Sequence, residues 1–342
     1  MHTIKEIAKL AGVSRGTVDR VLNSRGSVSP STERKVLEIA RAVKYSPNRA
    51  GKSLAVRKKM LKFGFVLFSS IASNPFFEDV VFGIKSRAAE LAEFGVTVEI
   101  RYAAIDDPKR QAACIDELTE LGIDGLAIIP INHPLIADRL RHLSESGIPV
   151  VTSNSDIPGC GRIAYVGSDY YKSGETAAGL MNLATRGCAN VGIIMGSALV
   201  LCHSERVDGF SQCTAKEFPD IRIIDSAVNN DDDFESFSVT KDMIKRFPQI
   251  DALYLAAGGI TGACRAVKDI GLAGKISIIS YDATPTTCQL LRDGVISATI
   301  AQQPVFQGAK PLDILLDYLV MGIEPEKEFY YTEIEIKIKE NL

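Results

Sequence analysis

The chain has 342 residues, of which 46% are hydrophobic and 24% are charged, with 39 Lys and Arg against 42 Asp and Glu. No stretch reaches the roughly 18 consecutive apolar residues that predict a membrane span. Seven Cys without a CxxC spacing and four unclustered His argue against a disulfide framework and against a zinc site. We expect a cytoplasmic protein that binds neither a metal nor a cofactor.

The charge is divided unevenly along the chain. Residues 1–60 hold 14 Lys and Arg against 4 Asp and Glu. The rest of the chain holds 25 Lys and Arg against 38 Asp and Glu. A basic block at one end of an acidic chain predicts that this block binds a polyanion such as nucleic acid.

The first 23 residues predict two short helices joined by a tight turn. Thr3 and Glu6 have the spacing of a capping box, which predicts a helix from the N-terminus. Ser14 is placed to cap a second helix, whose apolar residues share one face while Arg15 and Arg20 lie on the other. This pattern is typical of a DNA-binding helix-turn-helix, although amphipathic helix pairs also occur in ordinary bundles.

A third helix is predicted after Ser29-Pro30, which together form a helix start. Residues 47–55 follow a helix break and form either another short helix or a basic linker between domains.

The motifs AKLAGVSRGTVDRVLN and YSPNRAGKSLA resemble the N-terminal domain of the LacI/GalR family of bacterial transcription regulators. The resemblance implies a headpiece over residues 1–60, with the second helix in the major groove and a hinge helix at 47–55 that inserts Leu54 into the minor groove. The DNA-binding residues that it implies are Thr3, Ser14, Arg15, Gly16, Thr17, Asp19, Arg20, Asn23, Asn48, Arg49 and Leu54. Asp19 departs from the usual Ser of the family, so the operator sequence stays open.

From Lys62 onward, short apolar runs alternate with amphipathic helical stretches. The runs predicted as strands cover residues 63–68, 96–102, 125–131, 148–154, 190–196, 221–227, 252–258 and 276–282. Continuous apolar strands with helices between them indicate parallel sheets covered on both faces. Residues 61–342 are too many for one core, so the sequence predicts an α/β fold with two doubly wound parallel subdomains. A ligand would bind in the cleft between them, at the carboxyl ends of the strands.

This segment resembles the periplasmic-binding-protein type I fold, and the ribose-binding protein group in particular, through NPFF, RVDGF, ISYD and ATIAQQP. The resemblance implies one lobe of residues 61–163 plus 297–322 and another of 164–296 plus 323–342. It implies that Phe rings sandwich a sugar ring while polar groups bind its hydroxyls. The residues it places at the ligand are Asn74, Phe76, Phe77, Arg206, Asp282 and Gln302, with Phe234 as a weaker match.

Two departures from that group change the predicted ligand. Asn154-Ser155 stand where the group has Asp-Arg, and Gly258 lies where it has an Asn-Asp pair. We therefore expect an effector other than ribose. The amides near Gly258, beside Arg206, would suit an anionic group. Alternatively, Phe76 and Phe77 belong to the core, and Asp282 caps a helix that begins near Pro285.

The sequence thus predicts a transcriptional regulator, with repression as the expected mode, and no enzymatic activity. Its predicted partners are a pseudo-palindromic double-stranded operator, a sugar-like effector and a second copy of the chain, with no membrane. Effector binding would close the cleft, rotate the lobes and change the spacing of the two hinge helices, which would shift the affinity for the operator. The alternative is a solute-binding protein or a carbohydrate-active enzyme on the same fold. The direction of the effector response stays open.

Overall fold

The computed structural model describes residues 4–22, 28–42, 60–69 and 74–342. The predicted hinge helix at 47–55 lies outside these ranges. The same holds for five of the predicted DNA-binding residues, which are Thr3, Asn23, Asn48, Arg49 and Leu54. Among the helices of the described ranges, none combines the length and the apolar character needed to cross a bilayer.

The N-terminal block folds as predicted into three helices, α1 (Ile4–Ala11), α2 (Arg15–Leu22) and α3 (Pro30–Ala42). Local capping starts two of them, since Ser14 Oγ accepts from the Thr17 amide at 3.0 Å and Ser29 Oγ from the Thr32 amide at 3.3 Å. Their small shared core consists of Ile7, Ala8, Ala11, Val18, Val21, Val36 and Ala40. The headpiece therefore has a core of its own, separate from the cores of the other domains.

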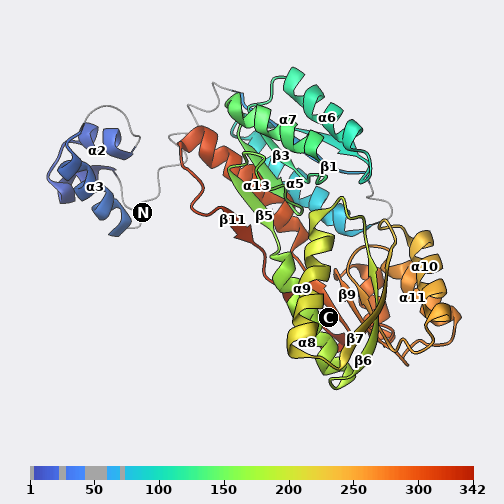
Figure 1. Cartoon of the computed structure of the whole chain (residues 1–342). Coiled ribbons are helices and arrows are strands. Elements are labelled where there is room, and N and C mark those ends of the chain that lie inside the picture. The colour runs from blue at the N-terminus through green and yellow to red at the C-terminus, as the bar shows by residue number, and fades with distance from the viewer. Residues whose placement is uncertain (1–3, 23–27, 43–59, 70–73) are drawn as a thin grey trace.

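The first lobe is a six-stranded parallel sheet in the order β11-β5-β4-β3-β1-β2. Its strands are β1 (Lys62–Phe68), β2 (Thr97–Ala103), β3 (Gly125–Ile128), β4 (Val150–Ser153), β5 (Ala164–Gly167) and β11 (Phe329–Tyr331). The helices α5 (Phe76–Ala92) and α13 (Pro304–Leu316) cover one face, and α6 (Pro108–Glu120) and α7 (Pro134–Glu145) cover the other (Figure 1). A π-helical turn, Asp317–Met321, extends α13.

The second lobe repeats this plan with the order β12-β10-β9-β8-β6-β7, in which only β12 is antiparallel to its neighbour. Its strands are β6 (Ala189–Met195), β7 (Ile221–Val228), β8 (Ala252–Leu255), β9 (Ser277–Tyr281), β10 (Ala298–Ala301) and β12 (Glu335–Lys337). The helices α8 (Tyr170–Thr185) and α9 (Leu201–Glu217) cover one face. The helices α10 (Asp233–Arg246), α11 (Ile260–Asp269) and α12 (Pro285–Arg292) cover the other, and a 3-10 turn, Lys339–Asn341, ends the chain. The predicted α/β fold with two doubly wound subdomains is confirmed.

The predicted lobe boundaries need correction at three segments. Residues 164–167 pair in the first sheet, residues 298–301 in the second and residues 329–331 in the first. The chain therefore crosses between the lobes after β5, after β10 and after β11. These strands are only three or four residues long, so their apolar pattern does not reveal which sheet they join. Their pairing is decided by contacts with residues far away in the sequence.

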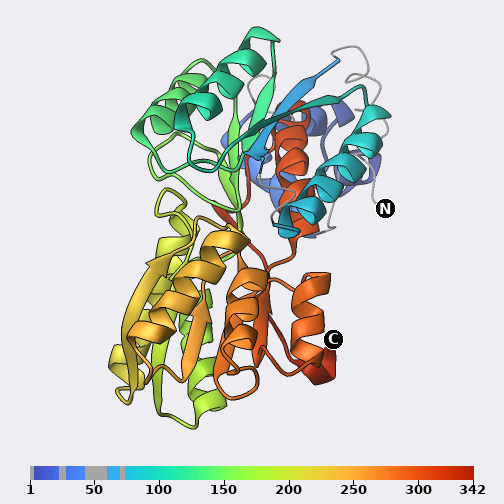
Figure 2. The same cartoon turned by 90° about the vertical axis from the view of Figure 1, so that its right-hand side faces the viewer.

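The three crossings lie side by side, where the two lobes meet in Figure 2. The hydroxyls of Ser168 and Thr332 are 2.6 Å apart, and the amide of Thr332 donates to the carbonyl of Gly167 at 2.9 Å. The crossing after β10 joins them, because Gln303 Oε1 accepts from the amide of Glu333, after β11, at 3.2 Å. Hydrogen bonds thus tie the connecting segments to one another, which allows them to act as one hinge.

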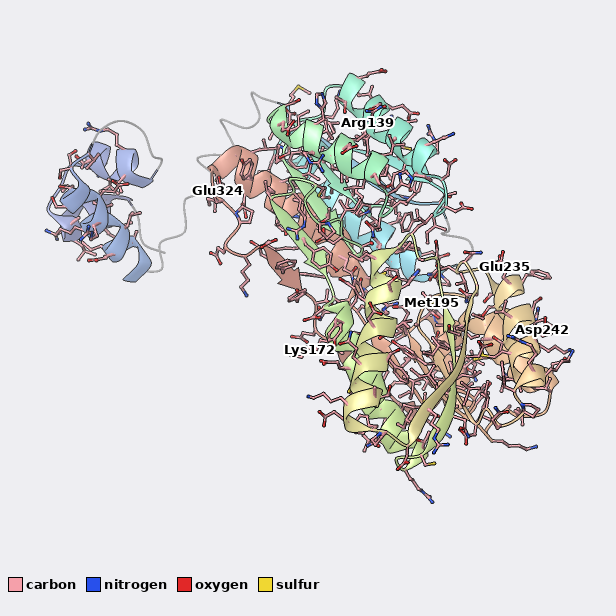
Figure 3. The ribbon with its side chains drawn as sticks, viewed as in Figure 1. Arg139, Lys172, Met195, Glu235, Asp242 and Glu324 are labelled. Atoms are coloured by element: carbon pink, nitrogen blue, oxygen red, sulfur yellow. The ribbon has the colours of Figure 1, made fainter. Side chains whose placement is uncertain are left out.

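The outer helices of the second lobe carry charged side chains into solvent. Lys172 on α8 and Glu235 and Asp242 on α10 are exposed, and Figure 3 labels all three. The polar groups that concern function lie at the carboxyl ends of the strands.

Candidate ligand-binding site between the lobes

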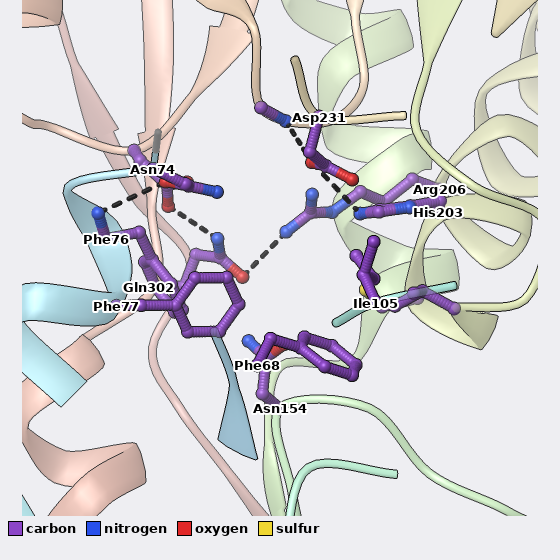
Figure 4. Close-up of a pocket in the computed structure, with 14 residues that line it drawn as sticks. Phe68, Asn74, Phe76, Phe77, Ile105, Asn154, His203, Arg206, Asp231 and Gln302 are labelled. Carbon is purple, nitrogen blue, oxygen red and sulfur yellow. Dashed lines mark hydrogen bonds and ion pairs between the residues drawn. The ribbon is translucent and has the colours of Figure 1, made fainter. Parts of the chain in front are cut away.

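A small cavity lies at the carboxyl ends of the strands, between the two lobes (Figure 4). Its free volume is about 20 Å³, which is roughly the room needed for a single water molecule. The residues that line it come from both lobes and are Phe68, Asn74, Phe76, Phe77, Ile105, Asn154, Val200, Cys202, His203, Arg206, Asp231, Gly258, Asp282 and Gln302.

The first lobe contributes an aromatic wall and an amide. Phe68 ends β1, and its ring meets the ring of Phe77 edge-on at 5.8 Å between centroids. The rings of Phe76 and Phe77 are 5.3 Å apart and also edge-on. Asn74 holds the start of α5, because its Oδ1 accepts from the Phe76 amide at 3.2 Å. This leaves the Asn74 Nδ2 group as a donor on the cavity side, next to the apolar face that the rings provide.

Asn154 lies at the end of β4 with a left-handed backbone, φ 58°. Its Nδ2 donates to the hydroxyl of Tyr170 at 3.1 Å and to Gln307 Oε1 at 3.0 Å. The neighbouring Ser155 is fully buried and its Oγ has no hydrogen-bond partner, but this residue does not line the cavity. Of the two residues at this departure from the ribose-binding group, the structure brings only Asn154 to the cavity.

Arg206 is the central cation of the site. Its Nη1 donates to the carbonyl of Ala256 at 2.8 Å and its Nη2 to Gln302 Oε1 at 2.7 Å. The guanidinium lies between the rings of Tyr281 and Tyr170, at 3.7 and 4.8 Å from their centroids. Only Nε lacks a partner. The protein itself therefore fixes the orientation of this side chain before any ligand binds.

Asp282 follows β9 with a left-handed backbone, φ 65°, and its Oδ1 accepts from Gln302 Nε2 at 2.5 Å. Burial raises the pKa of this carboxyl to about 6, against the opposing pull of Arg206. The alternative role as a helix cap is not what the structure has, because Thr284 caps α12 through the amide of Thr287. Gln302 thus links Asp282 to Arg206 in one polar chain (Figure 4).

A second polar group, which the sequence analysis missed, lies beside this chain. Asp231 Oδ1 accepts from the amide of Gly258 at 2.7 Å and lies 3.7 Å from His203 Nε2. His203 Nδ1 lies 3.1 Å from the carbonyl of Ser197. Burial alone lowers the pKa of His203, but Asp231 and Cys202 outweigh it and raise that pKa to about 9. His203 is therefore an imidazolium at neutral pH.

The structure places the predicted ligand residues unequally. Those that line the cavity are Asn74, Phe76, Phe77, Asn154, Arg206, Gly258, Asp282 and Gln302. Phe234 does not, since it lies in the first turn of α10 with 77% of its surface exposed and its ring facing Arg265. The amide of Gly258, predicted as open to an anion, is already bound to Asp231.

The lining residues that sequence reasoning missed are Phe68, Ile105, Val200, Cys202, His203 and Asp231. Two of them had a usable signal. His203 precedes Arg206 by three residues on one helix, which puts both on the same face. Asp231 follows an apolar strand at its carboxyl end, where ligand groups gather in parallel sheets.

A second set of contacts joins the lobes next to the cavity. Val200 and Cys202 are buried in the hydrophobic core of the first lobe although they begin α9 of the second. The amide of Asn132, after β3, donates to the carbonyl of Leu199 at 2.7 Å. The described conformation is thus closed by the protein's own contacts. In the described parts of the chain, no three His, Cys, Asp or Glu side chains are grouped to hold a metal ion.

In the headpiece, the leading end of α2 is accessible. Arg15, Gly16 and Arg20 are exposed, and Arg20 Nε donates to the carbonyl of Gly16 at 3.1 Å. Ser14 Oγ caps the helix and contacts the Thr17 hydroxyl at 2.9 Å. Asp19 lies on the same helix. A basic helix end of this kind presents donors to a phosphate backbone or to base edges.

Residues 65–323 match the family of periplasmic binding protein domains, and residues 3–48 match the lacI family of bacterial regulatory proteins. The chain belongs to the periplasmic-binding-protein family and carries a LacI-family headpiece. The resemblances found in the sequence are thereby confirmed.

Relatives of two kinds match this chain. The chain is 26% identical over 319 residues to a ribose operon repressor of Halalkalibacterium halodurans. This match covers 90% of this chain and 86% of that protein. It is 24% identical over 282 residues to the ribose import binding protein RbsB of Salmonella typhimurium. This match covers 82% of this chain and 92% of that protein. Among solved structures, an ABC transporter solute-binding protein from Burkholderia graminis in complex with D-arabinose has a TM-score of 0.75 at 25% identity, covering 82% of this chain and 96% of that one.

Proposed function

We propose that the protein is a transcriptional regulator whose affinity for operator DNA is set by a small sugar-like effector bound in the cavity between the lobes. The observation that carries this proposal is the joining, in one chain, of a LacI-family headpiece to a binding-protein domain with a polar and aromatic cavity. The similarity to a repressor over 90% of the chain supports repression as the mode.

The cavity supports recognition of a sugar-like molecule because aromatic side chains line one part of it and polar side chains line another. The rings of Phe68, Phe76 and Phe77 offer apolar surface to C–H groups. Across from them, Arg206, Asp282 and Gln302 form a fixed polar chain that suits hydroxyl groups. We propose that the eight predicted ligand residues that line the cavity contact the effector, whereas Ser155 and Phe234 do not.

The small size of the cavity supports coupling between the effector and the position of the lobes. A monosaccharide is far larger than the free space of about 20 Å³. The effector therefore requires a different arrangement of the lobes or of the lining side chains, and its binding energy shifts the population between arrangements. A coupling of about 1 to 3 kcal/mol is enough to change operator affinity by roughly 5-fold to 150-fold.

We also propose that the regulator acts as a homodimer on a pseudo-palindromic operator. A single helix-turn-helix makes too few contacts to select a site, and paired half-sites mirror a two-fold symmetric protein. An apolar patch on the first lobe supports this, because Phe82 on α5 and Val305 and Phe306 on α13 are 61, 42 and 37% exposed. Analytical ultracentrifugation of wild type and of Phe82→Glu would test it, with dissociation expected for the variant.

The proposed DNA contacts are those of the headpiece, Thr3, Ser14, Arg15, Gly16, Thr17, Asp19, Arg20, Asn23, Asn48, Arg49 and Leu54. A basic headpiece on an acidic chain supports this role over that of an exported solute-binding protein, and it supports a location in the cytoplasm with the DNA. No catalytic role is proposed for Asp282, because its carboxylate is already held by Gln302.

The test is selection of binding sites from random double-stranded DNA with the purified full-length protein. We expect the selected pool to contain an inverted repeat, and we expect Arg15→Ala to weaken binding to it by about 1 to 3 kcal/mol. Arg139→Ala, on the outer surface of the first lobe, is the matched control and should bind like wild type. A pool without sequence preference would contradict the proposal.

A further inference from the structure

The His203–Asp231 pair is the polar group of the cavity that neither the sequence motifs nor the proposed function used. Both side chains are almost fully buried, at 6 and 5% exposure, and both line the cavity. Buried charged groups are retained where they are paired and where they serve a structural or binding purpose. The bonding of each atom of the pair indicates which purpose it serves here.

The carboxylate of Asp231 is only partly satisfied by the protein. Oδ1 accepts one hydrogen bond, from the amide of Gly258, and Oδ2 accepts none although it is buried. A carboxylate has room for about four hydrogen bonds, so Asp231, which lines the cavity, keeps unused acceptor capacity. An unsatisfied buried carboxylate oxygen is costly, and a ligand that donates to it removes that cost.

The ring of His203 is oriented by the protein on both sides. Its two ring nitrogens face acceptors of the protein, the Asp231 carboxylate and the Ser197 carbonyl. The imidazole is therefore placed to hold the carboxylate through an ion pair, at a distance longer than that of a hydrogen bond. The room for the pair comes from two glycines, since a side chain at Gly196 would collide with both residues and one at Gly258 with Asp231 and Asn74.

Arg206 is engaged by the protein at both ends of its guanidinium group, although its Nε has no partner. Both terminal nitrogens of Arg206 donate to acceptors of the protein, and its faces are covered by Tyr281 and Tyr170. The cavity thus has two carboxylates, Asp231 and Asp282, against two cations, Arg206 and His203, that already contact acceptors of the protein. A ligand carboxylate or phosphate would meet Asp231 without gaining the bidentate cation that normally binds it.

We infer that Asp231 is a specificity-determining residue that accepts a hydrogen bond from an uncharged polyhydroxy effector and rejects its acidic or phosphorylated analogues, with His203 as its positioning residue. This inference rests on the proposed function and adds the charge of the ligand and the pair that selects it.

Calorimetric titration of the full-length protein tests the inference with matched probes. The pairs are D-ribose with D-ribose 5-phosphate, D-arabinose with D-arabinonate, and D-galactose with D-galacturonate, whose members differ by one anionic group. We expect a neutral probe to bind and its anionic partner to bind at least 100-fold more weakly. In Asp231→Asn the affinity for that neutral probe should fall at least 10-fold. The ratio of its affinity to that of the anionic partner should also become smaller. Asp242→Asn removes the same charge from the exposed face of α10 and should change neither value.

The role of His203 is tested by a double-mutant cycle, which separates positioning from a general loss of structure. His203→Gln should weaken binding of the neutral probe in the wild-type background. In the Asp231→Asn background it should not change that affinity further. Equal effects in both backgrounds would show that His203 does not act through Asp231.

Three outcomes overturn the inference: tighter binding of an anionic probe, an unchanged affinity in Asp231→Asn, and no binding by any neutral probe. Operator binding by the same preparation is measured alongside. If operator binding persists while no neutral probe binds, the inferred ligand class is wrong and the regulator proposal stands. If selective DNA binding is absent, the proposed function itself fails.

Discussion

The guanidinium of Arg206 lies 3.7 Å from the centroid of the Tyr281 ring, so the central cation of the cavity rests on the last residue of β9. That ring belongs to the core of the second lobe. The Tyr281 hydroxyl is 2.8 Å from Ser173 Oγ and 3.0 Å from the Tyr254 hydroxyl, and the Tyr254 ring stacks on Phe210 at 4.3 Å. Ligand binding and the stability of this lobe therefore depend on the same side chains.

Replacement of Arg206 by Met should destabilise the protein by about 3 to 5 kcal/mol, because it leaves the buried carboxylate of Asp282 without its cation. Urea denaturation followed by circular dichroism measures the loss. Arg139→Met removes an exposed Arg that pairs with Asp116 at the surface, and should change the midpoint little. Equal midpoints for the two variants would contradict a stabilising role for the Arg206 network.

The thermal stability of the protein should fall as the pH rises from 7 to 9. The folded pKa of His203, about 9, lies above its unfolded value of about 6.5. The stabilisation by protonated His203 is therefore complete below about pH 6.5 and lost as the pH rises through 9. The charged or titratable groups that set this pKa are Asp231, Cys202 and Arg206. Asp282, with a pKa of about 6, is already ionised in this range.

Scanning calorimetry at pH 7, 8 and 9 measures this dependence, with His203→Asn as the comparison. The decrease in Tm over the range should be smaller in the variant than in wild type. A decrease of the same size in both proteins would assign the pH dependence to other groups.

Gly174→Ala should destabilise the second lobe by about 1 to 3 kcal/mol, because α8 and α9 pack closely at this glycine. A methyl group there would collide with the backbone carbonyl of Arg206, and so would displace the helix that carries the site. Gly179→Ala lies on the same helix with open space around it, and should be neutral or stabilise by about 0.5 to 1 kcal/mol. Thermal melting compares the two variants. A Tm of Gly179→Ala that is lower than the Tm of Gly174→Ala would refute the packing argument.

Ile7→Ala should abolish operator binding while leaving effector binding intact. Ile7 is fully buried in the small core of the headpiece, where its truncation costs about 2 to 5 kcal/mol. Leu10→Ala, at a residue 57% exposed on the same helix, is the control and should retain a folded headpiece. Gel-shift assays and calorimetry measure the two binding activities separately. Loss of effector binding in Ile7→Ala would show that the domains do not fold independently.

The sequence by itself determined the features that depend on local chemistry. Ser14 and Ser29 cap their helices through hydrogen bonds that span three residues, so their role follows from spacing alone. The parallel α/β fold follows from apolar runs separated by helices. Several site residues were predictable for the same reason, since the ends of predicted strands identify residues such as Asn74 and Asp282 without any knowledge of how the strands pair.

Only the tertiary structure decided the features that depend on which distant segments meet. The short strands β5 and β10 joined the sheets opposite to those predicted, because pairing partners and not propensity choose the sheet. Phe234 and Asp231 are three residues apart, yet the start of α10 turns the first toward solvent and leaves the second in the cavity. The amide of Gly258 meets a carboxylate 27 residues away. Such contacts carry no periodic signal in the sequence, since they arise from the approach of separate elements in space.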